Sequence, residues 1–255
     1  MRSYLTILFL FFVIPASLLA QVKPAGNDTI RYSKILLVPY NPMMHLSDAD
    51  DAISQYSEKN KAQVRAQFRE GLLQNVDARL LSSYKTYTLQ SSVDGDELAD
   101  LETIYGTINY RMDTVYPVSH PSGKDTTTIV KKLFGKKASA GDLKYMNATL
   151  SHPELLHIYS KKYGTDLFVF LNQFEIITHY KDCYDIALKT YRRELKVHYS
   201  VYDASGMQVY GDVAVVNFPS STNDVSEIIS QNFPAIGNYV YSHIPPKEII
   251  ADNSQ

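Results

Sequence analysis

The side chains best suited to chemistry gather in one short stretch that contains His179, Asp182, Cys183 and Asp185. In a loop between two strands, a thiol with an imidazole and carboxylates can make a nucleophile and its base, or bind a metal ion. A lone cysteine beside a strand is more commonly a small apolar filler, and loops are normally rich in Asp and His. We therefore expect no catalytic residue and no metal site, and keep these four residues as the alternative catalytic candidates.

Other chemical motifs fail on their spacing. His152 and His157 are five residues apart, whereas a zinc-protease helix needs two histidines four apart with a glutamate beside the first. The segment 122–124, Ser-Gly-Lys, lacks both the first glycine and the final hydroxyl of a phosphate-binding P-loop. Neither G-x-S-x-G nor G-x-G-x-x-G occurs, so no familiar acyl-transfer or dinucleotide site is indicated. We expect no cofactor.

The first 20 residues have the pattern of a secretory signal peptide. Arg2 forms a short positive region, the apolar stretch 5–14 follows, and Ala20 supplies the small residue that signal peptidase needs before Gln21. The apolar stretch is too short to cross a hydrocarbon core of roughly 30 Å, and no cysteine follows it to carry a lipid. We predict cleavage between Ala20 and Gln21, export to the periplasm or the medium, and no transmembrane anchor in the mature chain.

Composition limits the possible partners. Without Arg2, 24 basic residues stand against 27 acidic ones, a formal charge of −3. This balance does not favour nucleic acid as a partner, because binding to the phosphate backbone requires clustered positive charge. Cys183 is the only cysteine, so the core must hold without an intrachain disulfide.

Hydrophobic periodicity predicts an α/β (α+β) fold: a mixed sheet of about four to five strands, with an antiparallel C-terminal hairpin and helices packed on it. The expected strands cover residues 34–40, 84–89, 167–180, 191–202 and 207–215. The expected helices cover residues 57–84, 98–108, 151–163 and 222–240. In the fourth strand, apolar residues alternate with a second set that we expect to face water: Arg192, Glu194, Lys196, His198 and Ser200.

The chain divides into a signal peptide (1–20), a polar segment (21–33), a single α/β domain (34–244) and a mobile tail (245–255). Inside the domain, residues 113–150 show no sustained period, which indicates a long insertion or loop. This insertion contains what we call the lysine patch, made of Lys131, Lys132, Leu133, Phe134, Lys136 and Lys137. An apolar pair flanked by four lysines suits an acidic protein surface or anionic lipid headgroups, although a flexible solvated loop is the other interpretation.

Three segments resemble exported bacterial α/β domains of the CsgG-like and TolB amino-terminal-like type. Residues 34–40 resemble their opening strand, residues 163–169 resemble their helix-end and strand signature, and residues 201–210 resemble their hairpin. The chain lacks the lipidated cysteine that many such proteins carry, and it has Asn172 where their strand ends in glycine. The resemblance implies a mixed sheet with helices packed on it, a bacterial periplasmic source, and use as a protein-binding module in envelope assemblies.

The leading hypothesis is an exported, non-enzymatic protein-binding module of the bacterial cell envelope, whose partner is another envelope protein. One alternative is an exported hydrolase or thiol enzyme that uses the loop around Cys183. Another is a small-ligand binder with a tyrosine-lined cleft, since the chain has 20 tyrosines and no tryptophan.

Overall fold

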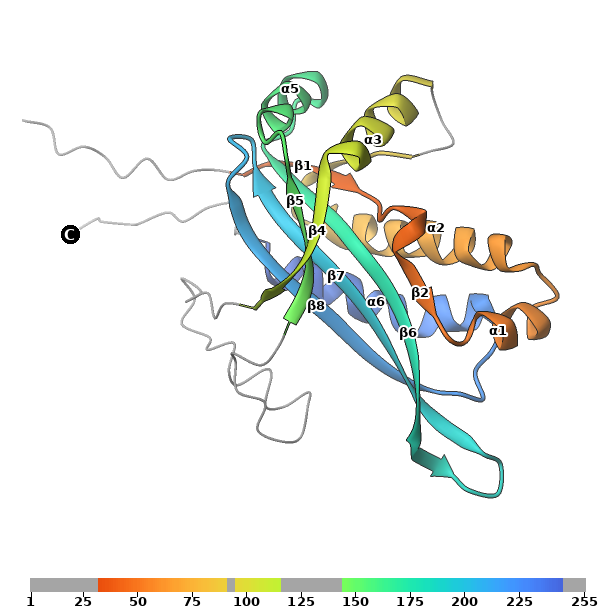
Figure 1. Cartoon of the computed structure of the whole chain (residues 1–255). Helices are drawn as coiled ribbons and strands as arrows, with labels where there is room; N and C mark the ends of the chain where they lie inside the picture. The colour runs from red at the N-terminus through yellow and green to blue at the C-terminus, as the bar shows by residue number, and fades with distance from the viewer. Residues whose placement is uncertain (1–31, 91–94, 116–143, 245–255) are drawn as a thin grey trace, which may run out of the picture. The chain divides into compact units, whose positions relative to one another are not determined.

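A computed structural model describes residues 32–90, 95–115 and 144–244, all of which belong to one compact unit. At its centre lies a six-stranded sheet, in which five strands follow the order β3-β1-β6-β7-β8 and β2 also pairs with β6 (Figure 1). These strands are β1 (Lys34–Val38), β2 (His45–Ser47), β3 (Lys85–Thr88), β6 (Leu167–Asp185), β7 (Thr190–Asp203) and β8 (Gln208–Pro219).

The sheet is mixed, which confirms the predicted fold class. β1 pairs in parallel with β3 on one side and with β6 on the other. β7 is antiparallel to both of its neighbours, β6 and β8, so the predicted C-terminal hairpin is also confirmed. At its turn, the Asp203 carboxylate accepts hydrogen bonds from the backbone N–H groups of Ser205 and Met207. Gly206 has a φ of 88°, a conformation that strongly favours glycine.

Asp166 fastens the start of β1 to the start of β6. Its carboxylate accepts hydrogen bonds from the backbone N–H of Ser33 at 2.9 and 3.1 Å, from the Ser33 hydroxyl at 3.0 Å, and from the backbone N–H of Lys34 at 3.0 Å. Ser33 and Asp166 are 133 residues apart in the chain. The central strand of the parallel half is therefore held by a partner from the distant second half of the sequence.

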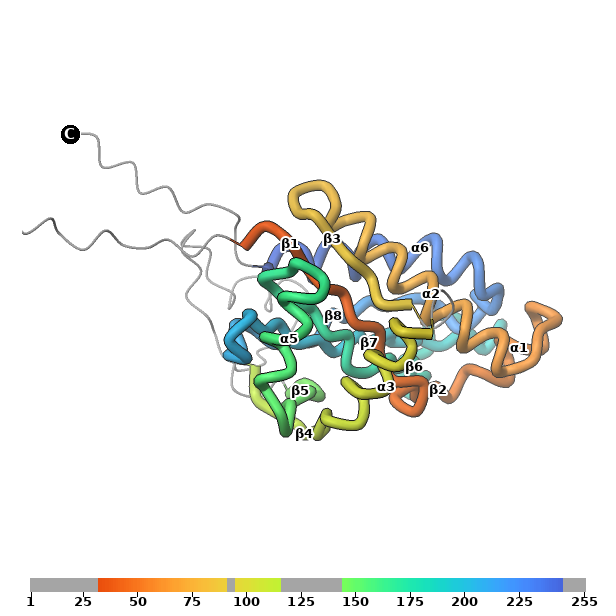
Figure 2. Tube along the Cα trace, turned by 90° about the horizontal axis from the view of Figure 1, so that it is seen from above, coloured from red at the N-terminus to blue at the C-terminus, as the bar shows by residue number. Residues whose placement is uncertain are grey.

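One face of the sheet is covered by α1 (Asp50–Tyr56), α2 (Lys61–Leu80) and α6 (Val225–Ser242), as Figure 2 shows. Every fourth residue of α2, from Val64 to Leu80, is fully buried, as the predicted apolar stripe requires. Phe68 on α2 stacks on Phe174 of β6 at 5.3 Å between ring centroids and lies 6.0 Å from Phe233 of α6. The helix predicted over 57–84 is α2, which is shorter because Asn60 caps its start and it ends at Leu80; α1 precedes the predicted range.

The opposite face is covered by α3 (Gly95–Thr107), α5 (Glu154–Tyr163) and a hairpin of β4 (Ile108–Thr114) and β5 (Lys144–Leu150) (Figures 1 and 2). Alternate residues of β1 enter the two cores: Ile35 and Leu37 lie with α2 and α6, while Leu36 and Val38 lie with α3 and α5. β1 is thus buried on both faces, as expected for a parallel strand between helical layers.

The hairpin corrects the prediction that residues 113–150 are a loop. Both ends of that segment are strand, since β4 extends to Thr114 and β5 spans Lys144–Leu150. β5 escaped detection because a polar residue, Asn147, occupies one of its most buried positions, with 1% of its surface exposed. Alternation of apolar and polar side chains, the usual signal of a strand, is therefore missing.

The same hairpin corrects the expectation that the polar side of β7 faces water. His198 and Ser200 are buried beneath β5. The Nδ1 atom of His198 accepts a hydrogen bond from the Met146 N–H, and the Ser200 hydroxyl donates to Oδ1 of Asn147 at 2.6 Å. Only the far part of this face, including Lys196, is half-exposed.

Candidate functional site

The four alternative catalytic residues lie in a strand, which corrects their placement in a loop. His179, Asp182, Cys183 and Asp185 all belong to β6, and the turn to β7 comes after Asp185. This part of β6 continues past the sheet and pairs with β7 through two register shifts. The sequence predicted a loop because polar and charged residues usually mark the end of a strand. Here these residues continue the strand as part of an exposed two-stranded ribbon.

His179, Asp182 and Asp185 each lie against a polar group outside the four, and the four do not form a common site. Asp182 accepts two hydrogen bonds from the Arg192 guanidinium at 3.0 and 2.8 Å, and Asp185 accepts the backbone N–H of Leu188 at 2.9 Å. Cys183 is an exposed free thiol. Within the described residues, no hydrogen bond connects this thiol to His179, whose Nε2 lies 3.6 Å from Glu194 Oε1. The geometry offers the thiol no base.

A buried polar chain that sequence reasoning missed follows β1. Nδ1 of His45 lies 3.3 Å from the Tyr40 hydroxyl, and Nε2 lies 3.1 Å from Oδ1 of Asp50, whose Oδ2 accepts the Arg65 Nε–H at 2.7 Å. Burial raises the pKa of the Asp50 carboxyl, but hydrogen bonds from His45 and Arg65 outweigh it and hold the pKa below its ordinary value. Burial raises the pKa of Tyr40, and its side chain has almost no contact with solvent. The chain therefore stabilises the connection after β1 and is closed to substrate.

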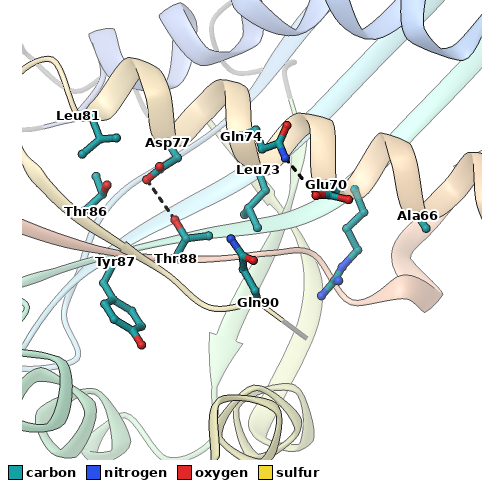
Figure 3. A pocket seen from close by; sticks show the side chains of 11 residues that line it. Ala66, Glu70, Leu73, Gln74, Asp77, Leu81, Thr86, Tyr87, Thr88 and Gln90 are labelled. Carbon is teal, nitrogen blue, oxygen red and sulfur yellow. Dashed lines mark hydrogen bonds between the residues drawn. The ribbon is translucent and has the colours of Figure 1, made fainter. Parts of the chain in front are cut away.

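The described surface has a pocket of about 500 Å³ between α2 and β3 (Figure 3). One wall is a side of α2 with the residue after it, Leu81. The other wall is β3 together with Gln90. The α2 side contributes Ala66, Arg69, Glu70, Leu73, Gln74, Asp77 and Leu81. The β3 side contributes Thr86, Tyr87, Thr88 and Gln90.

The pocket borders the open edge of the sheet. The backbone N–H of Lys85 donates to Ser33 O at 3.0 Å, and that of Leu89 donates to Leu37 O at 3.1 Å. Because alternate residues of a strand direct their backbone groups to opposite sides, those of Thr86 and Thr88 point away from β1. In the described part of the chain, no strand pairs with β3 on that side.

Polar contacts organise the walls of the pocket without filling it. The Thr88 hydroxyl donates to Oδ1 of Asp77 at 3.1 Å, and Gln74 Nε2 donates to Oε1 of Glu70 at 3.1 Å (Figure 3). At the end of the pocket, the Arg69 guanidinium donates to the Tyr40 carbonyl oxygen at 2.9 Å. Two carboxylates thus lie beside the apolar side chains of the α2 wall, which gives the pocket a mixed apolar and acidic character.

A second hollow, of about 270 Å³, lies beside β8 and bears on the hypothesis of a tyrosine-lined cleft. Tyr145 and Tyr210 line it together with Arg111 and Gln208. Its polar groups already bind one another: Arg111 donates to Asp113 at 3.0 Å, and Gln208 donates to the Tyr145 hydroxyl at 2.7 Å. The hollow is smaller than ligand pockets usually are, which range from roughly 300 to 1,000 Å³.

Some expectations concern residues beyond those described. The lysine patch (Lys131, Lys132, Leu133, Phe134, Lys136 and Lys137) and the cleavage site between Ala20 and Gln21 both lie outside the described ranges and stay predictions. Across residues 32–90, 95–115 and 144–244, no group of three His, Cys, Asp or Glu side chains is placed to hold a metal ion. No helix in those ranges combines the length and apolar character needed to cross a bilayer.

Comparison with known proteins gives little further information. No protein-family model and no curated protein matches this chain. Among solved structures, lipoprotein GNA1162 from Neisseria meningitidis is similar with a TM-score of 0.32 and 13% sequence identity, over 82% of this chain and 99% of that chain. A TM-score of this size does not define a common fold.

Proposed function

We propose that this chain is an exported, non-enzymatic protein-binding module of the bacterial cell envelope, which binds an extended segment of another envelope protein along β3. The pocket between α2 and the open edge of β3 is the observation that carries the proposal. The pattern of residues 1–20 supports export, and the resemblance of residues 34–40, 163–169 and 201–210 to envelope modules supports the compartment.

An extended segment can satisfy the free edge of β3 by adding a strand to the sheet. The outward backbone groups of Thr86 and Thr88 offer hydrogen bonds of the kind that bind peptides in strand-addition complexes. Every second side chain of the added strand would then face α2. There an apolar side chain meets Leu73 and Leu81, and a lysine or arginine meets Asp77.

A binding role fits the described groups better than an enzymatic one. The reactive candidates on β6 are separated along an exposed ribbon, and the Tyr40–His45–Asp50 chain is buried. The open edge, in contrast, combines unsatisfied backbone groups with a pocket of adequate size for side chains.

A displayed library of random linear peptides tests this proposal without knowledge of the partner. Peptides selected on the purified protein should lose binding when Gln74→Trp fills the pocket, and when Thr86→Pro removes an outward N–H from β3. Ala62→Trp places the same bulky ring on an exposed position of α2 outside the pocket, so it should leave binding unchanged.

Two results would contradict the pocket between α2 and β3 as the binding site. The first is an absence of selected peptides for the folded wild-type protein. The second is a set of peptides whose binding survives both Gln74→Trp and Thr86→Pro, in variants whose melting temperatures match that of the wild type. Cross-linking in intact envelopes, followed by mass spectrometry, then identifies the natural partner and tests whether its contact peptides lie beside β3.

A further inference from the structure

The end of the β6–β7 ribbon, residues 180–191, extends past the rest of the sheet, and we call it the arm. β8 pairs with β7 only as far as Arg192, which lies opposite Pro219, and β2 pairs with β6 only as far as Ile176. Beyond these points, β6 and β7 pair only with each other among the described strands, and Figure 1 shows the arm projecting from the sheet. An isolated two-stranded ribbon is marginally stable in water. The side chains of the arm therefore contribute little to the stability of the fold, and a role in binding would explain them.

The tip of the arm is apolar, although turns at such positions are usually polar. Ile186 and Leu188 are 85% and 76% exposed, and Ala187 between them is also exposed. Glycine, asparagine, aspartate and serine dominate ordinary turns because they tolerate the backbone and bind water. Here Lys189 takes the left-handed conformation instead, with a φ of 50°, and Asp185 accepts the Leu188 N–H. The turn is thus built to present two aliphatic side chains outward.

Tyrosines follow the aliphatic tip along the arm. Tyr184, two residues before Ile186, is 57% exposed, and Tyr180 is 67% exposed. The Tyr180 ring meets Tyr191 edge-on at 5.2 Å, which joins the two strands at the base of the arm, where the Tyr191 backbone also bonds to Ser220. Between Tyr180 and Tyr184 along β6, Asp182 forms an ion pair with Arg192 at 2.8 Å. An aliphatic tip is therefore followed along β6 by tyrosines, with charged residues between them.

We propose that the arm inserts its tip into the surface of a lipid bilayer. At a membrane interface, aliphatic side chains reach the acyl chains, while tyrosine rings and charged groups stay at the headgroups. Apolar faces that lie in this interface are buried by roughly 5–10 Å. Tyr184 comes two residues before Ile186, so its ring is expected at the headgroup layer when Ile186 in the turn reaches the acyl chains.

Charge and shape favour a membrane over a protein as the occupant. Lys181 and Lys189 have no ion-pair partner among the described residues, so both are available to anionic headgroups. A convex tip of three apolar residues offers far less than the roughly 800 Å² that each partner buries in a standard protein interface. A fluid bilayer, in contrast, accommodates a narrow tip without a complementary pocket.

The absence of tryptophan from the chain permits a direct measurement. In Ile186→Trp, the only tryptophan lies at the tip, and its emission should shift to shorter wavelength when phosphatidylcholine vesicles containing phosphatidylglycerol are added. Brominated acyl chains should quench this emission. Met43→Trp is a matched control, because Met43 is also 85% exposed but lies far along the chain from the arm, after β1. Its emission should not change.

Co-flotation with the same vesicles measures the contribution of the tip. Replacing both Ile186 and Leu188 with serine should lower the bound fraction by about tenfold or more, with an unchanged melting temperature, because the tip has no contact to lose in the folded protein. The double change Met43→Ser and Leu46→Ser removes exposed apolar residues elsewhere and should leave flotation unaffected.

Three outcomes would overturn the proposal. The wild-type protein could fail to float with the phosphatidylcholine vesicles that contain phosphatidylglycerol. The serine variant could also float as well as the wild type. Alternatively, sedimentation without lipid could show a self-association that only the arm substitutions abolish, which would assign the tip to a second copy of the chain. None of these measurements involves the β3 edge, so failure here leaves the proposed peptide groove untouched.

Discussion

The backbone N–H of Met146 donates a hydrogen bond of 2.9 Å to Nδ1 of His198. This bond leaves the ring proton on Nε2, which lies 3.3 Å from Oε1 of Glu175. One imidazole therefore connects β5, β7 and β6, and it anchors the β4–β5 hairpin to the sheet.

The Glu175–His198 contact predicts a specific dependence of stability on acid pH. The neighbouring His198 ring lowers the pKa of the Glu175 carboxyl in the folded state. The unfolded value is about 4.3, so the carboxylate stabilises the fold above that pH, and this contribution disappears as pH falls through the lower folded pKa. Urea unfolding between neutral and acid pH should show it. Glu175→Gln should flatten the pH profile in that range, whereas an unaltered profile would mean that the contact contributes nothing.

The register of β7 predicts opposite sensitivities for two neighbouring residues. Val197 is fully buried, whereas Lys196 is half-exposed and pairs with Glu194 at 2.8 Å. Val197→Asp places an unpaired carboxylate in the core and should cost several kcal/mol of unfolding free energy, against about 0.5 kcal/mol for a typical surface change. Lys196→Asp also loses this half-buried ion pair and places a second carboxylate beside Glu194, so it should cost more than a typical surface change but less than Val197→Asp. Similar melting temperatures would contradict this register.

Two glycines should respond to alanine in opposite directions. A Cβ atom on Gly211 of β8 would come within 2.3 Å of the Tyr145 hydroxyl, so Gly211→Ala should displace that ring and cost about 1–3 kcal/mol. Gly106 in α3 has no atom within 4 Å of the added Cβ, so Gly106→Ala should gain up to about 1 kcal/mol from helix propensity. Chemical denaturation of both variants distinguishes the two effects. A stable Gly211→Ala protein would show that β5 does not pack on β8 this closely.

Cys183→Ser should change neither stability nor peptide binding. The thiol is exposed and has no hydrogen bond to His179, so the substitution removes no packing and no reactive pair. Circular dichroism melting and binding of the selected peptides provide the measurements. A loss of binding or of biological activity with an intact melting curve would favour the thiol-enzyme alternative.

Much of the architecture could be predicted because local patterns coincide with the final packing. The apolar stripe on α2 and the apolar run of β6 can each be buried in only one orientation. The turn at Asp203 and Gly206 requires a specific backbone geometry that its residue types indicate. The β4–β5 hairpin could not be predicted in the same way, because Asn147 and Ser200 are buried through hydrogen bonds to each other. A polar pair of this kind has no hydrophobic period.

The candidate groove was hidden for a different reason. β3 and the helix before it were both expected from the sequence, but strand order was not, and only that order places Thr86 and Thr88 at an open edge. Local periodicity does not contain this information, since β1, the one described strand that pairs with β3, is separated from it in the chain by α1 and α2. The arm was equally hidden, because charged residues such as Asp182 and Lys181 interrupt the apolar pattern while the strand continues.

The attachment of β1 through Asp166 has a consequence for how the chain folds. Ser33 binds Asp166, which is synthesised 133 residues later. At a synthesis rate of about 5–20 residues per second, this interval lasts roughly 7–27 s. Contacts so distant in sequence raise the contact order and slow folding. The amino-terminal half therefore emerges from the ribosome without the partner that completes its central strand, and β1 can be fixed in the sheet only after the start of β6 has been made.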